Sequence, residues 1–258
     1  MNLKLGEHTM TNSILEQLTH HRSIRHFENK SLSSEQVAQL VDAAQHASTS
    51  TFSQQYSIIS VTDPETLKQI AKITGHGWML NAGHYFVMIA DQYRNLKIAQ
   101  QNDADAYILH TTDKFLASTF DVAIATENIM VAAESMGLGG TIMGSVLNDP
   151  RKMIELLDLP ELTFPLLGIA LGYPKDKPEL KPRLPKSAFH FSNHYNLGGN
   201  FQPELLQYDQ LVSEYYKERS TNDRTETFTH HIVSELSRGH DVRSDLFAII
   251  REQGLMLH

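Results

Sequence analysis

The sequence predicts an α+β or α/β fold, with one main domain over residues 1–199 and a helical extension over residues 200–258 that is part of the same domain. Three observations lead to this prediction. Helix-spaced segments alternate with short apolar runs in the first part of the chain. One segment is long and apolar enough for a central helix. Beyond Asn200 the composition shifts to polar helices whose apolar side chains need a surface to pack on, such as a second subunit.

The N-terminal elements follow from capping residues and periodicity. Ser33 and Gln36 match a capping box, and apolar residues then recur at helical spacing, which predicts a helix over Ser34–Ala47. The β-branched run Tyr56–Val61 predicts a strand. Pro64 follows an aspartate, as is typical of the first position of a helix. The chain therefore begins with a helix, a strand and a second helix.

Two apolar segments form the predicted centre. Tyr85–Ala90 is a nearly unbroken apolar run, typical of a strand covered on both faces. Asp113–Met136 is apolar on nearly all sides and predicts a central helix that Gly137 ends. A glycine pair then leads into a short strand at Thr141–Met143. The remaining predicted elements are a helix, a buried strand and three C-terminal helices: Arg151–Leu157, Phe164–Leu171, Pro203–Glu218, Glu226–Arg238 and Val242–Gln253.

Composition limits the class of ligand and the compartment. The 258 residues include 22 Lys and Arg against 30 Asp and Glu, a net charge of −8 that disfavours nucleic acid and anionic membranes as partners. The first nineteen residues lack the pattern of a signal peptide, and we expect no membrane span. The absence of cysteine excludes disulfides and thiolate chemistry and suits a reducing compartment. We therefore expect a cytoplasmic protein that binds small molecules.

Four polar clusters at loop positions are candidates for anion binding. Arg22 and Arg25 stand on either side of Ser23 and Ile24, so two guanidinium groups and a hydroxyl could grip a phosphate through charge-assisted hydrogen bonds. Hydroxyls, a glycine turn and two further cations recur in three other segments: Ser48-Thr49-Ser50, the turn ending at Gly144-Ser145, and Lys181-Pro182-Arg183. Each cluster alone is also consistent with an ordinary surface loop.

Several kinds of active site are disfavoured by missing motifs. The Gly137–Gly140 segment follows a helix, whereas the dinucleotide-binding GxGxxG follows a strand. There is no Walker motif and no GxSxG. The fourteen histidines form no His-Glu-x-x-His pattern, so we expect no metal site.

Five segments together carry a resemblance to a known family. They are His21–Phe27, Ser48–Phe52, Ala132–Gly140, Leu180–Pro185, and Tyr215-Tyr216 with Arg219 and Arg224. In this order they resemble the FMN-dependent nitroreductase superfamily, in its NADPH-preferring branch of oxygen-insensitive nitroreductases and flavin reductases. The similarity runs from about Leu15 to the C-terminus. The resemblance implies an α+β sandwich with an antiparallel-rich central sheet, a homodimer, and one FMN per subunit.

The resemblance also assigns residues to the cofactors. The implied FMN-binding residues are His21, Arg22, Ser23, Arg25, Ser48, Thr49, Ser50, His76, Ile142, Met143, Gly144, Ser145, Lys181 and Arg183. The backbone of Ile142–Ser145 is expected beside the flavin ring, and Arg219 and Arg224 at the 2′-phosphate of NADPH. His76 stands near the place where many relatives carry a glutamine, and whether it substitutes is open.

The implied activity needs no catalytic side chain, because flavin supplies the redox chemistry. We expect an NADPH-dependent FMN oxidoreductase that reduces nitroaromatics, quinones or flavins by a ping-pong mechanism. Two alternatives stay open: a flavin reductase that supplies free reduced FMN to a partner, and a flavin-binding module without turnover. The physiological acceptor does not follow from the sequence.

Overall fold

The computed structural model describes residues 13–196, 201–218, 226–237, 239 and 242–258. They form two compact units. The first contains the described residues up to Lys177 together with Asp245–His258, and the second is Pro178–Ser244. The second unit thus begins before residue 200, and the chain returns to the first unit for its last fourteen residues.

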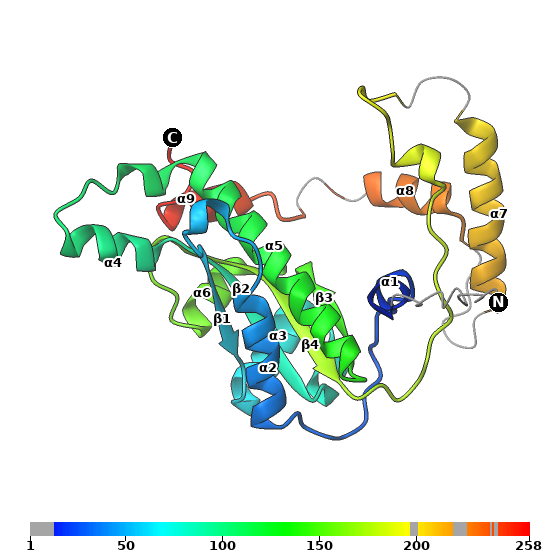
Figure 1. The fold of residues 1–258 in the computed structure, drawn as a ribbon, viewed down its shortest axis with the longest axis horizontal. Helices are drawn as coiled ribbons and strands as arrows, with labels where there is room; N and C mark the ends of the chain where they lie inside the picture. The colour runs from blue at the N-terminus through cyan, green and yellow to red at the C-terminus, as the bar shows by residue number, and fades with distance from the viewer. Residues whose placement is uncertain (1–12, 197–200, 219–225, 238, 240–241) are drawn as a thin grey trace, which may run out of the picture. The chain divides into compact units, whose positions relative to one another are not determined.

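A four-stranded antiparallel sheet lies at the centre of the first unit (Figure 1). Its strands are β1 (Tyr56–Ser60), β2 (His84–Asp91), β3 (Gly139–Met143) and β4 (Thr163–Gly172), in the order β1-β2-β4-β3. β1 and β3 are therefore the two edges. β2 and β4 are central and almost entirely buried, as their unbroken apolar sequences predict.

Helices cover both faces of this sheet. Because successive side chains of a strand point to opposite faces, Phe86 and Met88 of β2 pack with α2 (Ser34–Gln45) and the long helix α5 (Thr112–Ser135). Tyr85 and Val87 pack on the other face. That face is covered by α3 (Pro64–Thr74) and α6 (Pro150–Leu156). The predicted α+β sandwich with an antiparallel sheet and a long central helix is confirmed.

Several helices begin at the capping residues that the sequence predicts. The predicted capping box is present at Ser33, which accepts from the Gln36 amide at 3.2 Å while the Gln36 side chain accepts from the Ser33 amide at 3.0 Å. Asp63 and Asp149 cap α3 and α6, each with proline at the start of the helix. Gly137 follows α5 with a φ of +74°, a left-handed conformation that glycine adopts without steric cost.

Two helices in the first unit were not predicted. They are α1 (Ser13–Thr19) and α4 (Tyr93–Gln101). α1 has no buried residue and α4 buries only Leu96. The last helix, α9 (Leu246–Glu252), is also shorter than the predicted Val242–Gln253.

The second unit contains α7 (Gln202–Glu218) and α8 (Phe228–Leu236). Tyr208, Val212 and Tyr216 of α7 form its small core with Leu184 and Phe228. Short 3₁₀ helices complete the described elements of the two units: η1 (Ser50–Phe52), η2 (Gly77–Asn81), η3 (Tyr107–His110), η4 (Gly144–Asn148) and η5 (Lys186–Ala188).

α5 alone among the described helices has the length and hydropathy of a membrane span. Half of its most apolar stretch is buried inside the protein, against the sheet and α2. Its composition is therefore explained by its place as the core helix of the sandwich.

An ion-pair cluster ties α9 to α6. Arg151 donates two hydrogen bonds to Glu252 at 2.7 and 3.0 Å and one to Asp245 at 2.8 Å. These bonds from Arg151 hold the pKa of Glu252 below its ordinary range. A carboxylate with a depressed pKa stabilises the fold above its unfolded-state pKa, and this contribution is lost as the pH falls through its folded-state pKa.

We therefore expect Arg151→Ala to lower the melting temperature at pH 7. The decrease should be only a few degrees, because the side chains of Arg151, Asp245 and Glu252 are largely exposed. The difference from the wild type should shrink as the pH falls below about 4.3, the ordinary pKa of glutamate. Thermal melts of the variant and the wild type at pH 7 and below about pH 4.3 check this. Lys152→Ala, which removes an i,i+3 pair with Glu155, is the charge-matched control. A difference that is the same at both pH values would contradict the assignment.

Candidate functional site

The Arg22–Arg25 segment is held along the edge strand β3. Ser23 forms a parallel bridge with Gly140, and the Ile24 amide donates to the Gly140 carbonyl at 2.8 Å. The Thr141 hydroxyl donates to the Ile24 carbonyl at 2.7 Å. Glycine is required for this close approach, because a Cβ on Gly139 would lie 2.5 Å from Cγ1 of Ile24. The structure thus places the arginine segment beside β3, the strand that leads into the glycine turn.

The side chains of this segment divide between the core and the surface. Ile24 is buried in the core, whereas its neighbours Ser23 and Arg25 are exposed. Arg22 is half-buried, and its Nη1 donates to the His20 carbonyl at 2.9 Å. No described carboxylate forms an ion pair with Arg25. Pairing with β3 therefore fixes the backbone and leaves a hydroxyl and a cation at the surface.

The N-terminal end of the segment is tied to the last turns of α5. Nδ1 of His21 lies 2.6 Å from a carboxylate oxygen of Glu134, and the Gln17 side chain donates to the Val131 carbonyl at 2.6 Å. His21 is thus occupied by a partner from its own chain.

The glycine turn after β3 has an open side. A Cβ on Gly144 would meet nothing within 4 Å, so another molecule could approach this backbone. Next to it the buried hydroxyl of Ser145 has no hydrogen-bond partner in the described chain. Ile142 is partly exposed, but the Met143 side chain is buried in the core, which leaves only its backbone for contact with a ligand.

An aromatic series connects His76 to the arginine segment. The His76 and Trp78 ring centroids are 5.7 Å apart, and the Trp78 and Phe27 centroids are 6.3 Å apart. Asn148, at the end of η4, donates to the Ile73 carbonyl of α3 at 3.2 Å, which also brings η4 beside the end of α3. His76 and its neighbours therefore belong to the same region as Arg25 and Gly144.

The hydroxyl cluster Ser48–Ser50 is not part of this region within one chain. The Ser50 amide donates to Asp121 of α5 at 2.7 Å, whereas His21 contacts Glu134 of the same helix. Thirteen residues separate the two contact points, or about 20 Å at the helical rise of 1.5 Å per residue. The structure therefore separates Ser48–Ser50 from the arginine segment of the same subunit.

The Lys181–Arg183 loop belongs to the second unit and packs on α7. The Tyr208 hydroxyl donates to the Pro182 carbonyl at 3.1 Å, and the Lys181 ammonium lies 5.8 Å from the Tyr216 ring centroid. Burial raises the pKa of the Tyr208 phenol, and the nearby charge of Arg183 partly opposes this. Arg219 and Arg224 lie outside the described residues.

Sequence reasoning assigned no role to four residues that hold the predicted clusters in place. Phe27 and Trp78 connect His76 to the arginine segment, and Glu134 and Asp121 anchor two loops to α5. Asp121 carried a detectable signal, since a carboxylate within an almost wholly apolar helix needs a polar partner. No group of three or more metal-binding side chains occurs among the described residues.

Comparisons with known proteins identify the family. The model of the nitroreductase family matches residues 18–173, and that of the nitroreductase family C-terminal domain matches residues 181–258. The chain belongs to the nitroreductase family. The resemblance inferred from the sequence is thereby confirmed, and so is its branch, since the relatives below are NADPH-dependent reductases.

Relatives in this family match over almost their whole length. An NADPH-dependent oxidoreductase from Staphylococcus haemolyticus is 39% identical over 251 residues, covering 96% of this chain and 99% of that protein. The FMN reductase (NADPH) of Bacillus subtilis is 37% identical over 246 residues, covering 94% and 98%. The solved structure of the NfrA1 nitroreductase from B. subtilis has a TM-score of 0.89 and 36% identity, covering 95% of this chain and all of that one.

Proposed function

We propose that this protein is an NADPH-dependent flavin oxidoreductase of the nitroreductase type, with FMN as its bound cofactor. The relatives named FMN reductase (NADPH) and NADPH-dependent oxidoreductase support this function. The observation that carries it is the pairing of the segment that holds Ser23 and Arg25 with β3, the strand that leads to the open backbone of Gly144. Such an arrangement suits a ligand that joins a phosphate to a flat ring, as FMN does.

The residues present fit FMN in three respects. Arg22 and Arg25 supply cations for the phosphate or for the electron-rich edge of the ring, and Ser23 supplies a hydroxyl. Gly144 leaves room for a ring against the backbone, and the Ser145 hydroxyl still has hydrogen-bonding capacity. The resemblance also assigns Lys181 and Arg183, in the second unit, to FMN. Bound FMN would supply the redox chemistry between NADPH and an electron acceptor.

The protein's own contribution is binding, orientation and exclusion of water. The β3 pairing holds the Arg22–Arg25 segment at a fixed position. Ile142 is partly exposed near the end of β3, and Trp78 packs on the core cluster that contains Met143 of the same strand. NADPH and the acceptor would use one face in turn, which predicts ping-pong kinetics with nitroaromatics, quinones or flavins. Release of free reduced FMN to a partner is the alternative within this chemistry.

We further propose a homodimer. Leu116, Phe120 and Ile124 of α5 are four residues apart and 45%, 57% and 43% exposed, so they form an apolar stripe on the core helix. Phe52 of the neighbouring η1 is 83% exposed. Because Ser48–Ser50 lies about 20 Å from the arginine segment of its own chain, a second copy seated on this stripe would let it reach the partner's flavin. The proposed compartment is the cytoplasm.

The absorption spectrum of the purified protein, before and after anaerobic NADPH, tests the function. A bound flavin spectrum that bleaches with NADPH and recovers with an acceptor is the expected result. A bound flavin that does not bleach would favour a binding module without turnover. Colourless protein that also fails to take up added FMN would contradict the proposal.

The proposed NADPH contacts give a second expected result. Replacing Arg219 and Arg224 together by alanine should raise KM for NADPH by about 100-fold or more and leave KM for NADH nearly unchanged, because each charge-assisted bond to the 2′-phosphate contributes about 1.5–3 kcal/mol. Steady-state kinetics with both nucleotides measures this. Lys217→Ala, which removes an exposed cation at the end of α7, is the control. Equal changes for the two nucleotides would exclude the 2′-phosphate role.

A further inference from the structure

The loop before β1 has an unusual backbone. Thr51, Phe52 and Gln54 have φ values of +51°, +57° and +48°, in the left-handed region that residues with a Cβ rarely adopt. None of the three is glycine, the residue that adopts this conformation without steric cost. Three such residues within four positions persist only if surrounding contacts hold the loop firmly.

Asp121 of α5 supplies the contacts at both ends of this loop. Its carboxylate accepts hydrogen bonds from the backbone amides of Ser50 at 2.7 Å and Gln55 at 3.0 Å. The Gln55 side chain lies 3.4 Å from the same carboxylate. One side chain thus closes the segment that contains all three left-handed residues.

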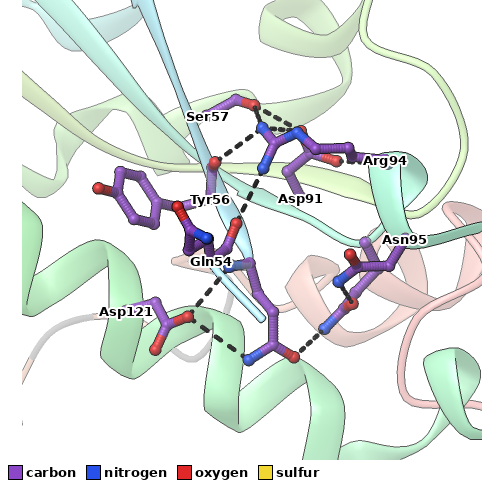
Figure 2. A network of polar contacts seen from close by, with 9 residues as sticks. Gln54, Tyr56, Ser57, Asp91, Arg94, Asn95 and Asp121 are labelled. Atoms are coloured by element: carbon purple, nitrogen blue, oxygen red, sulfur yellow. Dashed lines mark hydrogen bonds and ion pairs between the residues drawn. The ribbon is translucent and has the colours of Figure 1, made fainter. Parts of the chain in front are cut away.

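Further polar contacts hold the loop from α4 and α5. Arg94 donates to the carbonyls of Gln54 at 2.9 Å and Tyr56 at 3.1 Å, and Figure 2 shows Arg94 and Asp121 on opposite sides of Gln54. The buried Gln92 side chain donates to the Gln55 side chain at 2.7 Å and to the Ser118 hydroxyl at 2.8 Å. The loop is therefore fixed to α5 and α4 through hydrogen bonds, of which those of Gln55 with Asp121 and Gln92 are buried.

The Asp121 carboxylate has no described cation paired with it. It is 1% exposed, and its hydrogen-bond donors among the described residues are amide groups. Burying a carboxylate is unfavourable, and amide hydrogen bonds offset only part of that cost. Its electrostatic influence reaches Tyr56, whose pKa is raised by burial first and by Asp121 second. A buried charge that constrains a strained loop indicates that the conformation of the loop serves a purpose.

We infer that Asp121 is a positioning residue for flavin binding: it holds the Ser48–Gln55 loop in the one conformation that presents the Ser48–Ser50 hydroxyls and Phe52 outward from α5. The inference rests on the proposed function, in which these hydroxyls contact FMN. Asp121 itself would touch no cofactor and would act through its hydrogen bond with the Ser50 amide. Loss of its carboxylate would release the left-handed residues and disperse the hydroxyls.

A double-mutant cycle on FMN affinity tests the inference. Asp121→Asn keeps the size of the side chain but replaces one acceptor oxygen with a donor. We expect the FMN dissociation constant to rise about tenfold in Asp121→Asn. Adding Ser50→Ala to that variant should weaken binding no further, although Ser50→Ala alone weakens it in the wild type. Glu127→Gln, the same exchange at an exposed position of α5, should leave the affinity unchanged.

A second pair of variants addresses the case in which Asp121→Asn fails to fold. Ser50→Pro removes the amide that Asp121 binds, and Thr49 already has the extended conformation that precedes proline, with φ −128° and ψ 149°. Ser50→Pro should bind FMN several-fold more weakly than Ser50→Ala, which removes only the hydroxyl.

Unchanged affinity in Asp121→Asn, additive effects in the cycle, or equal affinities of Ser50→Pro and Ser50→Ala would each overturn the role of Asp121. These results leave the proposed function intact as long as the wild type binds FMN and is bleached by NADPH. Failure of the wild type to bind FMN would overturn both.

Discussion

Replacing Arg22 and Arg25 together by alanine is expected to lower the affinity for FMN by about two orders of magnitude or more while the fold persists. Each charge-assisted hydrogen bond to a phosphate contributes about 1.5–3 kcal/mol, and every 1.4 kcal/mol is about tenfold in affinity. The fold should persist because Arg25 is exposed, and because the bridge between Ser23 and Gly140 uses backbone atoms. The arginines are thus proposed to serve binding rather than stability.

The chain offers its own probe for this experiment. Trp78 is the single tryptophan and lies 6.3 Å from Phe27 at the end of the arginine segment. Bound flavin absorbs where tryptophan emits, so titration of the flavin-free protein with FMN should quench this fluorescence. Lys68→Ala with Lys72→Ala removes two exposed cations from α3 and is the matched control. Wild-type quenching curves in the double arginine variant would remove both arginines from the site.

Gly140→Ala is expected to be among the most destabilising single changes in the first unit. A Cβ at this position would lie 2.5 Å from the Ala170 carbonyl oxygen, a backbone atom of β4 that cannot move without disturbing the sheet. We expect a loss of about 3 kcal/mol, the upper end for overpacking, and a melting temperature lower by roughly 6–12 °C. FMN binding should fall as well, because Ser23 and Ile24 pair with this residue.

Gly144→Ala should weaken FMN binding without lowering the stability of the fold. Its Cβ would meet nothing within 4 Å and its φ is not left-handed, so the melting temperature of the flavin-free protein should match the wild type. FMN affinity should nevertheless fall by about tenfold or more, since the methyl group would occupy the space proposed for the ring. Gly239→Ala, at an exposed position of the second unit that is also in open space, is the control for both measurements. A Gly144→Ala variant with normal FMN affinity would place the ring elsewhere.

The sequence by itself determined the type and order of most elements and the family. Capping residues such as Ser33 and Asp63 act within a few positions of the helix that they begin. The unbroken apolar sequence of β2 likewise predicts that this strand is buried. The arginine and glycine segments were recognisable for the same reason, because their residue types and spacing are local properties. The short helices α1 and α4, with seven and nine residues, bury one residue at most and were missed.

Only the tertiary structure decided which of these segments meet. Ser23 pairs with Gly140 across more than a hundred residues, whereas Ser50 is anchored at Asp121, far along α5 from the contact of His21. It also decided that Met143 points into the core and that Asp121 closes a strained loop. Such contacts depend on strand order and on the packing of α5 against the sheet. The periodicity of a segment predicts which of its residues are buried, but not which distant segment they pack against.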